Sequence, residues 1–324
     1  MDETGSLDEA WARYWRSNRL ASCGGEGGRP YQPAIVAHWD GLLDTLPSPV
    51  RLLDLCCGNG ALALHALRRL RARGVTAVVT AVDRAPIDPA RWLPTERDDL
   101  AAIHFHGGVA AENLPFAENA FTAVLGQYAL EYTDVARTLE ACRRVLAPGG
   151  TLAFVLHARE GITVRAAAAQ GEAVARLFAL GYFPAADRLA ADAGRGGARR
   201  EEAARLFAAK DRALAALACG PVEPAMYANV RDVVRDALAH LGRVPVDVVR
   251  AKIAEVAEHV ADHAARTGAL LSAARGRDEI RSLFAPLPSW GFRFLGDCPE
   301  PLAGPHGLLG WSVRLVREGA HKGV

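Results

Sequence analysis

The fold of this chain is decided by residues 52–64, which read LLDLCCGNGALAL. An apolar run breaks at a glycine-containing turn and then resumes with leucine and alanine at helical spacing, which predicts a strand, a tight loop and a helix. Gly58 and Gly60 can adopt positive φ and carry no Cβ, so a ligand can approach this backbone closely. Such closeness favours a bulky, flat, polar cofactor. Glycine turns of this kind are common in α/β domains, however, so the turn alone identifies no ligand.

The composition limits the class of protein. The chain has 324 residues, 50% of them hydrophobic, enough for one large α/β domain with an elaboration or for two modest domains. Lys and Arg number 38 against 37 Asp and Glu, without a long run of one sign, which argues against a nucleic-acid partner. No apolar stretch reaches the roughly 20 residues of a membrane span, and the N-terminus lacks the order of a signal peptide. We therefore expect a cytoplasmic protein without a membrane partner.

The cysteines favour free thiols in a reducing compartment. They form no CxxC pair and no metal-like grouping with histidine, so we expect no metal site. The six lie at positions 23, 56, 57, 142, 219 and 298.

A second strand is predicted at residues 76–82, which are continuously apolar and β-branched and end at Asp83. An acidic residue at the end of the second strand, about 20 residues beyond the glycine turn, can accept hydrogen bonds from both hydroxyls of a ribose. Asp83 follows Gly60 at this distance. A lone aspartate after a strand can also be a helix cap or a turn residue, but here we assign Asp83 to ribose binding.

Strands and helices alternate over the next hundred residues. Further strands are predicted at 103–106, 122–125 and 151–156, and a helix at 134–146 ends before Pro148-Gly149-Gly150. The right-handed crossover rule makes a doubly wound, mostly parallel α/β sheet the natural fold, with ligands at the carboxyl ends of the strands.

Five motifs follow one another between Val50 and His157. They are LDLCCGNG at 53–60, AVD at 81–83, ENLPF at 112–116, FTAV at 121–124 and RVLAPGG at 144–150. In this order they resemble the class I S-adenosylmethionine-dependent methyltransferase family. The resemblance implies a Rossmann-like sheet of seven strands and S-adenosyl-L-methionine as the cofactor.

The resemblance also implies roles for single residues. The methionine portion would lie against the glycine turn, at Asp54, Cys56, Gly58 and Gly60. The ribose would lie at the end of the second strand, at Asp83 and Arg84. The adenine would lie beyond the third strand, at Ala110 and Ala111, and the sulfonium near the end of the fourth, at Gln127.

Two of these residues depart from the family pattern. Cys56 stands where the first glycine is usual, which implies a slightly different turn. Ala110 stands where the family commonly has an aspartate that bonds the adenine amine, so one polar contact worth on the order of 1 kcal/mol is missing.

Methyl transfer to an oxygen can require a base, and His157 at the end of the fifth predicted strand is the candidate. A histidine at a strand end can also be purely structural. Tyr128, after the fourth strand, is the second candidate catalytic residue. We expect Tyr132 and Arg159 to line the acceptor site together with these two residues, and no metal to take part.

The N-terminal region, residues 1–49, is expected to form a helical lid. Residues 7–20 place Trp11 and Trp15 four positions apart on a short amphipathic helix, a spacing that also suits packing on a core. A second helix is expected at about 32–46, after a glycine-rich loop at 22–30.

The composition shifts after the cofactor-binding core, residues 50–157. Residues 158–276 are rich in alanine, leucine and arginine and form an all-helical insertion after the fifth strand, either a cap over the site or a dimerisation element. Residues 277–324 return to the core with a last helix and a closing antiparallel pair. The helices of the insertion are predicted at 162–180, 198–218, 225–241 and 246–267, and the paired strands at 291–296 and 310–317.

We therefore expect a methyltransferase that acts on a small molecule, at a hydroxyl or carboxylate oxygen of a secondary metabolite. A nucleic-acid or protein methyltransferase and a non-catalytic S-adenosylmethionine-binding or dimerisation protein remain alternatives. The chain lacks the Asn/Asp-Pro-Pro-Tyr motif used on base amines and the Pro-Cys pair used on cytosine carbon. A homodimer is compatible with the helical stretch.

Overall fold

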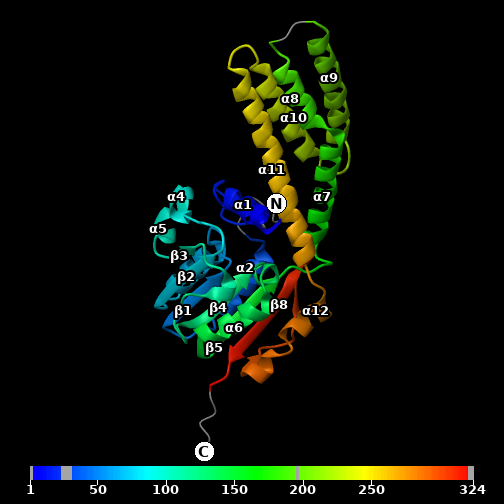
Figure 1. Cartoon of the computed structure of the whole chain (residues 1–324). Coiled ribbons are helices and arrows are strands. Elements are labelled where there is room, and N and C mark those ends of the chain that lie inside the picture. The colour runs from blue at the N-terminus through cyan, green and yellow to red at the C-terminus, as the bar shows by residue number, and fades with distance from the viewer. Residues whose placement is uncertain (1–2, 23–30, 195–196, 320–324) are drawn as a thin grey trace, which may run out of the picture. The chain divides into compact units, whose positions relative to one another are not determined.

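The computed structural model describes residues 3–22, 31–194 and 197–319, and the side chains from residue 7 onward. Eight strands form one sheet in the order β3-β2-β1-β4-β5-β8-β6, with β7 paired to β8 (Figure 1). β1 to β5 run parallel, and β8 is antiparallel to its three neighbours. The strands are β1 (Val50–Leu55), β2 (Ala77–Asp83), β3 (His104–Gly107), β4 (Phe121–Gln127), β5 (Leu146–Leu156), β6 (Phe292–Phe294), β7 (Glu300–Gly304) and β8 (Gly307–Arg317).

The chain order reverses between β1 and β4, which makes the carboxyl ends of these strands the point where an open α/β sheet binds its ligand. The doubly wound, mostly parallel sheet expected from the sequence is thereby confirmed. The α-helices are α1 (Glu3–Trp15), α2 (Pro33–Leu43), α3 (Ala61–Ala72), α4 (Pro89–Trp92), α5 (Arg97–Leu100), α6 (Val135–Val145), α7 (Ile162–Leu180), α8 (Tyr182–Ala191), α9 (Ala198–Ala218), α10 (Pro224–Ala239), α11 (Val246–Ala273) and α12 (Arg277–Phe284).

The sheet is buried on both faces, because alternate residues of each strand point to opposite sides. On one face Leu52 and Val79 pack in a cluster with α2 and α3. On the other, Leu53 and Phe154 pack with α6 and α12. Three layers result, and the strand ends between them remain the place for a ligand.

The chain divides into two compact units. The first contains residues 1–165 and 269–324, and the second contains residues 166–268. The second unit consists of helices α8 to α10 and most of α7 and α11, drawn in green to orange in Figure 1. It has its own core around the buried rings of Tyr182 and Tyr227. In the described residues, no helix is long and apolar enough to cross a bilayer.

Some elements differ from the sequence predictions. α1 ends at Trp15 rather than near residue 20, and β5 begins at Leu146 rather than 151, through a register irregularity opposite Phe121. α8 was not expected, because Pro184 indicated a break. Proline is tolerated in the first helical turn, where its missing N–H costs nothing.

One strand is additional to the seven expected. β7 contains Pro301 and pairs only with β8, at the edge of the sheet, where proline removes no needed ladder bond. The antiparallel pairing expected at the C-terminal end is confirmed by the β6–β8 ladder. The glycine-rich loop predicted at 22–30 falls almost wholly outside the described residues.

Candidate active site

Two carboxylates hold the glycine turn in place. Asp83 Oδ2 accepts a hydrogen bond from Gly58 N at 2.7 Å, and its Oδ1 accepts one from Ala85 N at 2.8 Å. Asp54 Oδ2 accepts from Ala63 N at 3.0 Å, at the start of α3. The acid at the end of β2 is therefore joined directly to the bend that follows β1.

Burial makes both carboxylates weak acids. It raises the pKa of Asp54 to about 8, against the opposing hydrogen bond from Ala63. It raises the pKa of Asp83 to about 6, although the N–H groups of Gly58 and Ala85 pull the other way. Asp83 is therefore ionised at neutral pH and can accept hydrogen bonds from a ligand.

The turn takes left-handed backbone at three positions, Cys56 (φ 50°), Gly58 (φ 54°) and Gly60 (φ 82°). At Cys56 the resemblance expected only a slightly different turn. The backbone there keeps the conformation that favours glycine, so the cysteine bears strain of about 1 kcal/mol or more.

Trp15, the last residue of α1, covers the face of Gly58. A Cβ built on Gly58 would lie 2.3 Å from Trp15 Cζ2, so the indole occupies the space beside the bare backbone. Phe105 of β3 lies in the same way against Gly60, with Cζ 2.5 Å from an added Cβ. The approach to the turn is thus covered by two aromatic side chains.

Asn59 fastens the end of α1 to this turn. Its Nδ2 donates to the carbonyl oxygens of Trp15 and Arg19, both at 2.7 Å. These two bonds fix which side-chain atom is nitrogen, so Oδ1 faces elsewhere; it is buried and has no hydrogen-bond partner in the described residues.

A row of rings extends from the glycine turn to the end of β5. Trp15 stacks on Trp11 with centroids 5.7 Å apart, and Trp11 meets Tyr132 edge-on at 6.4 Å. Tyr132 meets His157 edge-on at 6.0 Å, and Tyr128 stacks on His157 at 3.9 Å. Three of the predicted catalytic and acceptor residues therefore lie together.

His157 is buried and clamped by a carboxylate. Glu131 Oε1 accepts from His157 N at 2.7 Å and lies 2.9 Å from Nδ1. Glu131 belongs to the short turn Leu130–Tyr132 after β4 and has a fully buried side chain. Tyr128 (φ 53°) donates its hydroxyl to the Leu309 carbonyl at 3.0 Å. This hydrogen bond holds the Tyr128 ring against the imidazole of His157.

The remaining predicted residues divide between the site and the surface. Gln127 accepts the Trp39 indole N–H at 2.5 Å through Oε1, and its buried Nε2 has no partner in the described part of the chain. Arg84 lies 3.5 Å from Glu112 on the surface. Ala110 and Ala111 lie at the start of the short turn after β3.

Arg159 does not join the ring cluster. Its guanidinium is more than half exposed and pairs with Glu279 at 2.7 Å, at the start of α12. The expectation that Arg159 lines the acceptor site finds no support in this geometry.

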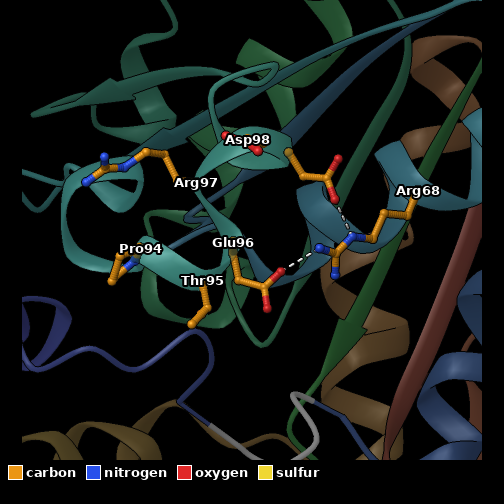
Figure 2. Close-up of a pocket in the computed structure, with 7 residues that line it drawn as sticks. Arg68, Pro94, Thr95, Glu96, Arg97 and Asp98 are labelled. Carbon is orange, nitrogen blue, oxygen red and sulfur yellow. Dashed lines mark hydrogen bonds and ion pairs between the residues drawn. The ribbon is translucent and has the colours of Figure 1, made fainter.

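A polar surface pocket of about 310 Å³ lies apart from these residues (Figure 2). Arg68 points into it from α3 and is already paired with Glu96 at 2.5 Å and Asp99 at 2.7 Å. It contains none of the predicted residues. Across the described residues, no group of three or more His, Cys, Asp or Glu side chains is placed to hold a metal ion.

Part of the chain matches the model of a known protein family. Residues 52–150 match a family model described as a methyltransferase domain. The match runs from β1 through the motifs quoted above to the beginning of β5.

Residues 52–150 form a methyltransferase domain.

Named relatives of this methyltransferase domain cover only part of the chain. The chain is 36% identical over 109 residues to a 2-phytyl-1,4-naphtoquinone methyltransferase of Trichormus variabilis, which is 32% of this chain and 44% of that protein. It is 34% identical over 138 residues to an uncharacterized methyltransferase of Mycobacterium bovis, 42% of this chain and 49% of the relative. The chain thus spans about half the length of these curated relatives.

Among solved structures, similarity extends to the geranyl diphosphate C-methyltransferase of Streptomyces coelicolor A3(2), at 20% identity and a TM-score of 0.35. The likeness covers 47% of this chain and 65% of that structure. A protein named YcgJ from Bacillus has a TM-score of 0.31 at 23% identity, over 38% of this chain and 51% of the other.

The residues of this domain can accommodate the cofactor of the family on one condition, which concerns the position of Trp15. The bare backbone at Gly58 and the carboxylate of Asp83 lie side by side, and the buried Asn59 Oδ1 and Gln127 Nε2 still lack partners in the described chain. Trp15 occupies the face of Gly58, however. The methyltransferase domain can accept the cofactor on this turn when Trp15 leaves it.

Three residues of the site were not predicted from the sequence. Glu131 lies 26 positions from His157, and Asn59 lies 44 from Trp15. Trp39, which holds Gln127, comes from a helix 88 residues away. Only Glu131 carried a usable indication, since an acid immediately after a central strand lies where ligands bind.

Proposed function

We propose that the protein transfers a methyl group from S-adenosylmethionine to a hydroxyl oxygen of a small aromatic acceptor. The observation that carries this proposal is the position of His157, buried among tyrosine rings at the end of β5, in a row of rings that begins at the cofactor turn. Aromatic walls favour a flat acceptor, and an imidazole is suited to take its hydroxyl proton.

The cofactor supplies an electrophilic methyl group on positively charged sulfur. Asp83 would hold the ribose, the turn at Gly58 would let the methionine portion approach, and Gln127 Nε2 would donate a hydrogen bond near the reacting centre. The protein's remaining task is to position the acceptor and exclude water, which accounts for most of the rate in displacements of this kind.

The N-terminal segment would act as a lid that must open first. Trp15 lies on the turn and Asn59 ties it there, so binding of the cofactor requires α1 to move. After that movement Trp11 and Trp15 would re-cover the bound ligands.

The relatives support an aromatic acceptor over a nucleic acid. Relatives from Trichormus and Nostoc are named for a naphthoquinone, a flat ring system, although they match only about a third of this chain. The near balance of charge, 38 basic against 37 acidic side chains, gives RNA no evident footprint. For the helical unit, we propose either a cover for the acceptor or a dimerisation element.

The test is transfer of labelled methyl from S-adenosylmethionine to separate pools of phenols and hydroxynaphthalenes, aromatic acids, RNA and protein. The expected result is label in a hydroxylated aromatic, with the new methyl located on oxygen by NMR. Label in RNA or protein, or on ring carbon, would overturn the acceptor assignment. No label in any pool, with His157→Ala equally inactive, would leave a binding protein.

A further inference from the structure

Among the described residues, Glu131 is a buried carboxylate that pairs with no lysine or arginine. Its side chain has no exposure to solvent, and among the described residues its hydrogen bonds all come from His157. Its second oxygen, Oε2, is buried with no partner in the described chain. Burying a carboxyl group whose second oxygen makes no hydrogen bond is unfavourable, so a compensating role is expected.

Capping the strand end does not by itself require the charge. The His157 N–H at 2.7 Å would be accepted equally well by the oxygen of an uncharged amide side chain. The contact that uses a carboxylate is the one to Nδ1, at 2.9 Å. An acceptor-only group facing Nδ1 fixes the proton there in the neutral ring, and the lone pair then lies on Nε2.

The rings on either side prevent the imidazole from turning away. Tyr128 stacks on it at 3.9 Å with an interplanar angle of 22°, and Tyr132 stands at 85° to it. The Tyr128 hydroxyl is tied to the Leu309 carbonyl, and its backbone lies in the left-handed region, which a tyrosine adopts only under constraint. The orientation of His157 is therefore fixed from three sides.

We propose that Glu131 is a positioning residue for methyl transfer, which sets the tautomer of His157 and stabilises the imidazolium formed during the reaction. This inference rests on the proposed function. In the step, the acceptor O–H bond breaks and its proton moves to His157 Nε2. The oxygen forms the new O–C bond while the S–C bond breaks, and that bond's electron pair stays on sulfur.

The acceptor class follows from this arrangement. A base supported by a carboxylate helps an acceptor whose hydroxyl is still protonated at working pH, and gives nothing to an acceptor already ionised. The dependence on Glu131 therefore distinguishes a weakly acidic phenol from its nitro-substituted analogue, in which the oxygen is already anionic. A structural role would affect both acceptors alike.

The first arm uses the wild-type protein without any acceptor. Nitrogen-15 NMR of the imidazoles at mildly alkaline pH, with the His157 signal identified by its loss in His157→Phe, reports which ring nitrogen carries the proton. We expect the proton on Nδ1. A proton on Nε2 would overturn the proposal, whatever the reaction proves to be.

The second arm is kinetic and uses Glu131→Gln, which keeps the side-chain size and an oxygen for the His157 N–H. With the phenol found in the acceptor screen, kcat should fall about 100-fold with KM changed less than about threefold. With the nitro analogue, kcat should stay within about threefold. Asp134→Asn is the matched control, since Asp134 also accepts one backbone N–H, from Arg137 at 3.2 Å, outside the ring cluster.

Equal losses with both acceptors, or no loss with either, would overturn the role of Glu131 while leaving methyl transfer intact. Absence of transfer by the wild type would instead overturn the proposed function, and the tautomer would still be decided by NMR.

Discussion

At the scale of single residues, the site depends on carboxylates that burial has made weak acids. Asp54 and Asp83 flank the glycine turn from two strands, and each accepts hydrogen bonds from backbone N–H groups. Removing Asp83 altogether would leave Gly58 N and Ala85 N without their acceptor. Asn is therefore the informative substitution, since it keeps one oxygen and loses the charge.

Binding of adenosyl ligands should depend on pH through Asp83. Its pKa is raised to about 6, so the carboxylate is protonated below that pH and loses acceptor capacity for ribose hydroxyls. The affinity for S-adenosylhomocysteine should fall about tenfold from pH 7.5 to pH 5, the effect of roughly one pKa unit. Calorimetric titration measures this, and Asp83→Asn should bind weakly with little pH dependence. The same pH profile in both proteins would contradict the assignment.

Stability should depend on pH through Asp54. Its pKa is raised to about 8 from the ordinary 3.8, so the unfolded chain releases this proton at lower pH than the folded protein. Asp54 therefore opposes folding increasingly as pH rises from about 4 to about 8. Asp54→Asn should gain stability relative to wild type between pH 5 and pH 8, on the order of a few kcal/mol. Urea unfolding at the two pH values checks this; a constant difference would contradict it.

At the scale of elements, α1 is the part whose contacts decide access to the turn. Sequence reasoning found the aromatic helix and left core packing and a lid open, but it could not place Trp15 on Gly58. That contact joins residues 43 positions apart through a segment that leaves helical conformation after Trp15. Helical spacing predicts which residues share a face, but not what that face meets.

Trp15→Ala should change affinity and stability in opposite directions. Clearing the face of Gly58 raises the fraction of molecules able to bind, so the Kd for S-adenosylhomocysteine should fall about tenfold. Loss of a buried indole should lower the free energy of unfolding by about 3 kcal/mol. Trp290→Ala, a half-buried indole after α12, is the control and should leave Kd unchanged. A higher Kd for Trp15→Ala would mean that the indole holds the ligand instead of blocking it.

Helix and strand boundaries followed the sequence closely where glycine or a cap marked them. The helices at 162–180 and 198–218 were predicted with the bounds observed, since glycines flank them. α8 was missed because Pro184 indicated a break, and β7, which contains Pro301, was not predicted. Both prolines occupy positions where a missing N–H is harmless, a tolerance that only the three-dimensional context reveals.

At the scale of the whole molecule, the chain divides into two compact units, and the helical unit has a hydrophobic core of its own. The core of the helical unit includes an ionic cluster around Asp211, which is 8% exposed. Arg231 donates two hydrogen bonds to it at 2.9 Å, Arg235 donates a third, and the Tyr182 hydroxyl lies 3.3 Å away. A substitution in this cluster can therefore test whether the helical unit is stabilised separately from the sheet.

Asp211→Ala should destabilise the helical unit by about 3 kcal/mol, because it leaves the mostly buried guanidinium of Arg231 without its partner. Scanning calorimetry should show one transition moved to lower temperature, with affinity for S-adenosylhomocysteine unchanged. Asp187→Ala removes an exposed ion pair to Arg250 and should cost less than about 1 kcal/mol. A loss of ligand affinity in Asp211→Ala would show that the two units are coupled.

The central claim is that the turn at Gly58 and the carboxylate of Asp83 together bind one adenosyl ligand. The most direct measurement is calorimetric titration of S-adenosylhomocysteine into wild type and Asp83→Asn at pH 7.5, with thermal unfolding of both. We predict one site per chain in the wild type and at least about tenfold weaker binding in the variant, with the fold retained. No binding by the wild type, or equal affinity in a folded variant, would contradict the account.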